Sequence, residues 1–119
     1  MTIFIPGNVP SSKNSKQWTG KLLISSKTTR NYIKQSWPFW IENAEKFKAA
    51  ASKLSKPLSI SFLFVRKSKH KFDYINPCQT VQDIMVKAGW LADDHADLLI
   101  PYFEKYLYDK DNPGVYITI

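Results

Sequence analysis

Residues 58 to 66 read LSISFLFVR, and their apolar side chains recur at every second position. The recurring residues are Leu58, Ile60, Phe62 and Phe64. Because side chains of a β-strand alternate between two faces, this spacing places all four on one face. The stretch therefore predicts a strand with one face on a hydrophobic core, and the fold must contain a sheet.

The segment before this strand has a helical period instead. From about Thr28 onward, apolar residues recur at alternating steps of four and three, which places them in one stripe along a helix. The stripe consists of Ile33, Trp37, Trp40, Ala44 and Phe47. Pro38 interrupts the pattern without ending it, so we expect one kinked helix rather than two helices. The aromatic side chains of the stripe indicate a core, with base stacking as the alternative.

A second helix is predicted after the strand. Asn76 followed by Pro77 is typical of a helix start, with Asn76 as the cap, and Gly89 supplies the stop. One face of this helix is apolar and consists of Val81, Ile84, Met85 and Ala88. The opposite face carries Asn76, Gln79 and Asp83. One face is therefore expected to pack, which leaves the other free for chemistry.

The other strand candidates are residues 2–6, 22–25, 99–108 and 115–119. A DKDNPG turn joins the last two. This order of strands and helices indicates α+β or mixed α/β architecture, with a small sheet packed by two main helices. No repeat or linker divides the chain, so residues 1–119 are expected to form a single domain.

The net charge of +7 is distributed unevenly along the chain. Residues 1–72 carry 14 Lys or Arg against 2 acidic residues, whereas residues 73–119 carry 3 Lys against 8 acidic residues. A cationic surface attracts polyanions, and nucleic acid is favoured over a membrane because there is no basic amphipathic terminal helix.

The single cysteine, Cys78, excludes an internal disulfide and suits a reducing compartment. There is no apolar run of about 18 residues and no cleavable signal pattern. We therefore expect a soluble cytoplasmic protein that does not contact a membrane.

Two groups of basic residues are candidates for contacts with DNA phosphates. They are Lys13, Lys16 and Lys21 in an early polar loop, and Arg66, Lys67, Lys69 and Lys71 after the strand at 58–66. The alternative is that these residues only cover a solvated loop or sheet edge. No pattern of Arg and Asn typical of a recognition helix is present, so we expect selectivity for DNA structure rather than sequence.

Aspartates gather around the second helix. Asp73 precedes it, Asp83 lies on its free face, and Asp93 and Asp94 follow its end. Such a helix is only about 18 Å long, and the chain can turn back at Gly89, so these carboxylates can converge. Mg²⁺ prefers a few carboxylates together with waters and phosphate oxygens, and it would relieve their mutual repulsion. The alternative is that some of them are solvated turn or cap residues.

The spacing of these residues resembles a family signature. In FDYINPCQTVQDIMVKAGWLADDHAD, residues 72–97, the matching positions are Asp73, Asn76, Asp83, Asp93 and Asp94. They resemble the signature of the RusA family of Holliday-junction resolvases, small endonucleases common in phages and prophages. That signature runs D-x-D-N, two residues, K, three residues, D, and then a DD pair after a helix and an apolar turn. The strand ending in Pro-Gly and the loop VPSSKNSK are similar too, so the resemblance covers nearly the whole chain.

The resemblance implies an α+β homodimer, with a RusA-like domain, that binds four-way DNA junctions. It implies paired nicks that depend on Mg²⁺, or on Mn²⁺ as a substitute, during recombination and repair. Asp73 and Asp94 would be direct metal ligands, and Asp83 and Asp93 further ligands or groups that polarise a bound water. Asn76 would orient this site or act only as a helix cap.

Two positions depart from the signature. Its second aspartate is Ile75 here and its lysine is Gln79. Isoleucine cannot bind a metal, and glutamine brings no charge to the scissile phosphate. Either Asp83 or Asp97 supplies the missing carboxylate, with Gln79 orienting a water or a phosphate, or the chain has kept DNA binding and lost cleavage. A nuclease for flaps, forks or single strands is a third alternative.

His95 stands among the aspartates, between Asp94 and Asp97. As a general base or a phosphate donor it would take part in catalysis. An exposed turn histidine is the favoured interpretation.

Overall fold

The computed structural model describes residues 1–11, 16–18 and 23–119, and the side chains of residues 1–11 and 26–119. The main sheet contains β1 (Thr2–Pro6), β4 (Leu58–Arg66), β5 (Leu99–Phe103), β6 (Leu107–Tyr108) and β7 (Gly114–Thr118). Its strand order is β1-β7-β4-β5, and β6 also pairs with β4. The pairs β1–β7 and β4–β7 are antiparallel, whereas β5 and β6 run parallel to β4. The sheet is therefore mixed.

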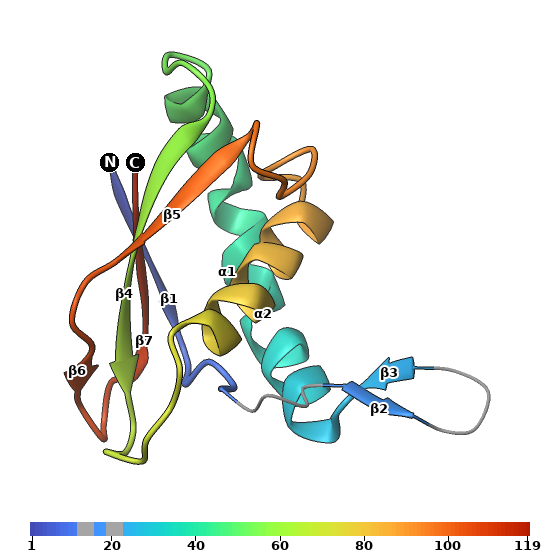
Figure 1. Ribbon diagram of the computed structural model, residues 1–119, viewed down its shortest axis with the longest axis vertical. Coiled ribbons are helices and arrows are strands. Elements are labelled where there is room, and N and C mark those ends of the chain that lie inside the picture. The colour runs from blue at the N-terminus through green and yellow to red at the C-terminus, as the bar shows by residue number, and fades with distance from the viewer. Residues whose placement is uncertain (12–15, 19–22) are drawn as a thin grey trace.

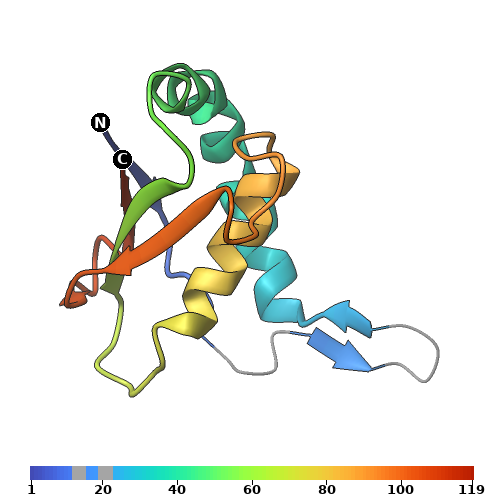
Figure 2. The ribbon, with the colours of Figure 1, turned by 45° about the horizontal axis from the view of Figure 1, so that its top comes forward.

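Two helices, α1 (Lys27–Ala51) and α2 (Ile75–Lys87), pack on one face of this sheet (Figures 1 and 2). The predicted α+β class is confirmed. Two short strands, β2 (Lys16–Trp18) and β3 (Leu23–Ser25), pair with each other outside the main sheet. No helix in the described ranges is long and apolar enough to span a membrane.

Strand β4 lies at the centre of the core. Leu58, Ile60, Phe62 and Phe64 are all buried, as their alternation predicts. They face apolar side chains of both helices in one cluster. The predicted strand and its bounds are confirmed. Among regular structures, only a β-strand places every second side chain on one face over this length.

Helix α1 continues through Pro38, so the prediction of one helix is confirmed. Pro38 itself is exposed, while Trp40 and Phe47 are fully buried. The core role of these aromatic residues is therefore established. Buried Ser36 adds a polar link within the helix, since its hydroxyl donates to the Tyr32 carbonyl and accepts from the Trp40 indole N–H.

Two predicted boundaries are wrong. Helix α2 begins one residue before Asn76, and its cap position is Tyr74, which makes no side-chain cap hydrogen bond. Asn76 instead donates its backbone N–H to the Asp73 carbonyl at 3.1 Å. Residues 99–108 form two strands, because the Tyr106 N–H donates to the Tyr74 hydroxyl at 2.9 Å and so leaves the ladder between β5 and β6.

Candidate metal and nucleic-acid site

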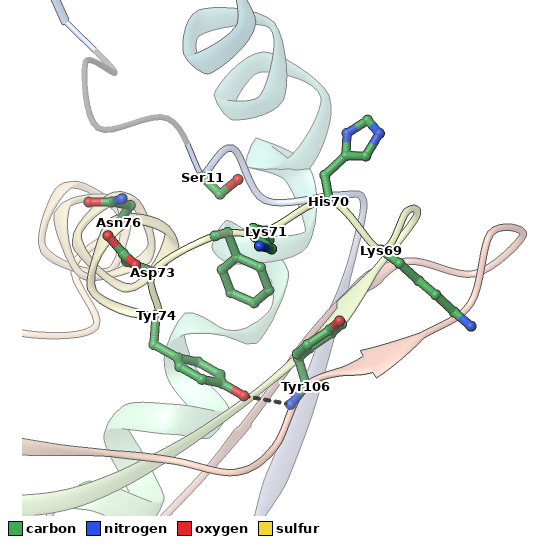
Figure 3. Close-up of a pocket in the computed structure, with 9 residues that line it drawn as sticks. Ser11, Lys69, His70, Lys71, Asp73, Tyr74, Asn76 and Tyr106 are labelled. Carbon is green, nitrogen blue, oxygen red and sulfur yellow. Dashed lines mark hydrogen bonds between the residues drawn. The ribbon is translucent and has the colours of Figure 1, made fainter.

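Asp73 lies at the entrance to α2, in the segment that follows β4. Its side chain is exposed, and that of Asn76 is half-buried. Figure 3 shows the two side chains next to each other. The Asn76 N–H donates to the Asp73 carbonyl, so a single turn of the backbone brings the two residues together.

Arg66 holds the start of this segment. Its guanidinium donates to the Val9 carbonyl and, at 2.9 Å, to the Ser11 hydroxyl, and it lies 4.7 Å from the centre of the Phe72 ring. Only 7% of Arg66 is exposed. Burial lowers its pKa, and the neighbouring Tyr32 opposes that shift. The interpretation of Arg66 as a surface phosphate contact is therefore replaced by a structural role.

Aromatic contacts fix the backbone on both sides of Asp73. The Phe72 ring makes edge contacts with Tyr74 and Tyr106, with ring centres 5.3 and 5.1 Å apart. Tyr74 stacks on Phe103 at 5.5 Å. Because its two chain neighbours are packed, Asp73 presents a solvated carboxylate from an anchored backbone.

The segment between α2 and β5, residues 89–98, which we call the acidic loop, begins at a glycine turn. Gly89 has a φ of 82°, which favours glycine. Its N–H donates to the Val86 carbonyl, and the Trp90 N–H donates to the Met85 carbonyl. These two bonds are the Schellman arrangement that ends a helix and reverses the chain. The predicted stop at Gly89 is confirmed.

Trp90 anchors this loop to α1. Its indole stacks on Phe47, with ring centres 4.8 Å apart, and lies 5.2 Å from Trp40. With 3% exposure, it fixes the loop three residues after α2 ends. The following Leu91 is also buried, so the path to Asp93 and Asp94 starts from a packed position.

Asp94 lies in the segment between α2 and β5. Burial raises the pKa of the Cys78 thiol to about 12, and the negative charge of Asp94 adds to that shift. The next residue, His95, accepts the N–H groups of Leu98 and Leu99 at its carbonyl, so the loop adjoins the start of β5, beside the last turns of α2 (Figure 1). The predicted convergence of the carboxylates of Asp73, Asp83, Asp93 and Asp94 stays a prediction.

Three further candidates are Asp93, Asp83 and His95. Asp93 is exposed, and its carboxylate accepts the Asp94 N–H at 2.8 Å, which shapes the turn. Asp83 is half-buried on α2. His95 is exposed and its Nδ1 accepts the Asp97 N–H at 3.2 Å, as expected of a turn residue.

In the described ranges, no three His, Cys, Asp or Glu side chains gather closely enough to form a metal-binding group. The donors near the first turn of α2 are the carboxylate of Asp73 and the amide of Asn76 (Figure 3). Mg²⁺ is commonly bound through one or two carboxylates, with waters and substrate phosphates completing its shell. This donor set fits an open, water-rich Mg²⁺ site rather than a closed protein cage.

The two departures from the signature face solvent. Ile75 is 70% exposed, and Gln79 is exposed one turn further along α2. Neither side chain is needed for the core. Their positions leave room for substitution without a change in packing.

A hollow of about 530 Å³ adjoins Asp73. We call it the Asp73 hollow, and its lining includes Ser11, Lys71, Phe72, Asp73, Asn76 and Tyr106. Lys69 and His70 also line it, although their side chains point away from Asp73 (Figure 3). A cavity of this size, with polar groups and rings together, suits a small polar or nucleotide-sized group.

A second hollow, of about 630 Å³, lies beyond Lys69 and His70. We call it the Tyr108 hollow, and it is lined by Lys67, Ser68, Lys69, His70, Tyr108 and Lys110. The Lys69 ammonium lies 5.2 Å from the centre of the Tyr108 ring. The predicted basic residues Lys67, Lys69 and Lys71 are exposed as expected. Lys110 and Tyr108 were not predicted, because they follow β5 far along the sequence.

The early basic loop contains the remaining predicted DNA contacts. Lys13 and Lys21 lie outside the described residues. Lys16 begins β2, and its backbone alone is described. Their predicted contacts with DNA stay predictions.

Comparison with known proteins identifies no family for this chain. No protein-family model matches it, and no curated protein does.

Proposed function

We propose that this chain is a Mg²⁺-dependent endonuclease for branched DNA, of the Holliday-junction resolvase type, acting in recombination and repair. The observation that carries the proposal is the exposed carboxylate of Asp73, beside the amide of Asn76 in the first turn of α2 and in a hollow that Lys71 also lines. Asp73 precedes the same turn. The spacing of Asp73, Asn76, Asp83, Asp93 and Asp94 along the chain, which resembles the RusA signature, supports Asp94 as the second carboxylate.

In this mechanism, Asp73 and Asp94 would bind the cation and Asn76 would orient the site. When bound, Mg²⁺ supplies an activated water and neutralises charge on the scissile phosphate. Asp93 shapes the turn before Asp94, and Asp83 is a further ligand or polarises a bound water. Lys71, next to the segment that carries Asp73, offsets the repulsion between the carboxylates and the DNA backbone.

The test is a nicking assay on a synthetic four-way junction and on a linear duplex of matched sequence, with Mg²⁺ or EDTA. We expect metal-dependent cuts on the junction, strongly reduced in Asp73→Asn and Asp94→Asn. Asp111→Asn is a matched control, because this exposed aspartate lies in the turn before β7. Cutting that survives both site substitutions contradicts the proposed site.

A second function is favoured by one observation. The exposed Ile75 stands where the RusA signature has its second aspartate, and an isoleucine side chain cannot bind a metal. This supports a junction-binding protein that does not cut. Junction binding that is equal in wild type and Asp94→Asn, without nicking by either under Mg²⁺ or Mn²⁺, would select it.

The same proposal includes a homodimer, since paired nicks at a four-way junction require two sites. It also places the protein in the cytoplasm, where the DNA of a phage or bacterial host is found. Sedimentation of the protein with and without junction DNA tests the dimer.

A further inference from the structure

Three surface hollows surround the segment 67–71, and each shares residues with the next. Lys69 and His70 line both the Asp73 hollow and the Tyr108 hollow. Lys67 lines both the Tyr108 hollow and a third one of about 580 Å³. We call the third the Phe39 hollow; it lies between the end of β1 and the first half of α1, and its lining includes Asn8, Asn31, Gln35, Phe39 and Lys67. The three therefore adjoin one another.

Each hollow combines a cation with an aromatic ring that solvent reaches. The Phe39 hollow has Lys67 with Phe39, which is 39% exposed. The Tyr108 hollow has lysines with Tyr108, which is 49% exposed. The Asp73 hollow has Lys71 with the half-buried rings of Phe72 and Tyr106. Basic grooves with rings at intervals are typical of single-stranded nucleic-acid binding, since cations track the phosphates and bases stack on the rings.

Charged side chains are distributed unevenly among the three hollows. Asp73 is the one carboxylate that lines any of the three hollows within the described residues. Asp109 and Asp111 flank Lys110 in the chain without lining the Tyr108 hollow. The Phe39 hollow instead offers amide groups from Asn31 and Gln35. A polyanion would therefore meet cations and neutral groups along the path and a carboxylate at its end.

We propose that these hollows form one track for a single DNA strand, which runs from Asp73 past Lys69 and Lys67 to Phe39. The inference rests on the proposed function, and it adds a substrate class to it. The preferred DNA has a strand that separates from its complement next to the cut, as at a fork, a flap or an open junction centre. A duplex would contact the lysines without reaching the rings, because its bases are already stacked.

The test is binding of labelled oligothymidylate of about 15 nucleotides, in EDTA, to wild type, Phe39→Ala and Tyr108→Ala. Each substitution is expected to weaken this binding by about 5- to 150-fold, the usual loss for one stacked base. Binding of a blunt duplex of equal length should not change. Tyr116→Ala is the matched control, because Tyr116 is 38% exposed on the opposite face of the sheet and lines none of these hollows.

Oligothymidylate binding that is equal in wild type and in both variants would overturn the track. Failure of wild type to bind oligothymidylate would overturn it as well. The nicking assay on the four-way junction separates this failure from failure of the proposed function. Metal-dependent nicking without strand binding would support the nuclease function and contradict the track. Strand binding through Phe39 and Tyr108 without nicking would support the track and contradict the nuclease function.

Discussion

The indole N–H of Trp90 donates to the backbone carbonyl of Trp40 at 2.7 Å. The donor belongs to the acidic loop, and the acceptor lies in the middle of α1, just after Pro38. This bond connects the position of Asp94 to the longest helix of the fold. The placement of the candidate metal ligands therefore depends on packing within the core as well as on α2.

Trp90→Phe tests this connection. It keeps an aromatic ring against Phe47 and leaves the buried Trp40 carbonyl without this partner, so we expect a loss of about 1–3 kcal/mol in the free energy of unfolding. Urea denaturation followed by circular dichroism measures the loss. Tyr116→Phe is the control, and an equal effect on both variants would contradict the role of the bond.

Arg66 and its neighbour Lys67 should respond differently to replacement by methionine. Arg66→Met removes charge-assisted bonds to Val9 and Ser11, and we expect it to cost about 2–4 kcal/mol of stability. Lys67→Met, at an exposed position, should leave the unfolding midpoint unchanged and weaken DNA binding. Equal stability of the two variants would show that the guanidinium is not structural.

Gly89→Ala isolates the cost of the left-handed turn. A Cβ at this position meets nothing within 4 Å, so the expected loss of about 1–2 kcal/mol comes from the backbone alone. Gly89→Asn should lose less, because asparagine tolerates this conformation better. Thermal unfolding of the three proteins gives the order, and an alanine variant as stable as wild type would contradict it.

The buried thiol of Cys78 predicts how stability changes with pH. Its folded pKa is raised from 9.0 to about 12. As pH rises from about 9 to 12, the unfolded chain therefore loses the thiol proton and the folded chain keeps it. Stability then falls with a slope of at most about 1.4 kcal/mol per pH unit from this group. Denaturation midpoints between pH 8 and pH 11 should fall less steeply in Cys78→Ala, and parallel curves would contradict the prediction.

Lys110 should contribute to DNA binding although it lies far from the basic run in sequence. Lys110→Gln is expected to reduce the slope of log affinity against log salt by about 0.7–0.9. Lys87→Gln, at the exposed end of α2, is the control. Anisotropy titrations at several salt concentrations measure both slopes, and identical slopes for Lys110→Gln and wild type would exclude the contact.

The features that could be predicted from sequence are periodic or local. The alternation of Leu58 to Phe64 has one extended solution, and the stripe across Pro38 is long enough to outweigh the proline. Gly89 is recognisable because the end of a helix commonly needs a positive φ. The reversal of the chain after α2 follows from that stop.

The features that could not be predicted depend on contacts between distant residues. Arg66 opens a basic run and therefore resembles a surface residue, but the Val9 carbonyl that it binds lies 57 residues away. Asparagine is a common helix cap, yet the cap position of α2 is Tyr74. The Tyr74 ring stacks on Phe103 and its hydroxyl accepts the Tyr106 N–H, so the helix starts earlier than predicted. Lys110 joins the basic segment because β6 pairs in parallel with the end of β4, a register that no local pattern specifies.

The position of β7 has a consequence for how the chain folds. β7 lies between β1 and β4, and those two strands do not pair directly. The sheet is therefore incomplete until residues 114–118 insert between segments that are distant in sequence, so we expect slow folding with a late closing step. A chain still lacking this strand during synthesis would expose the edges of both neighbours, which makes β7 the strand that protects the nascent protein from aggregation.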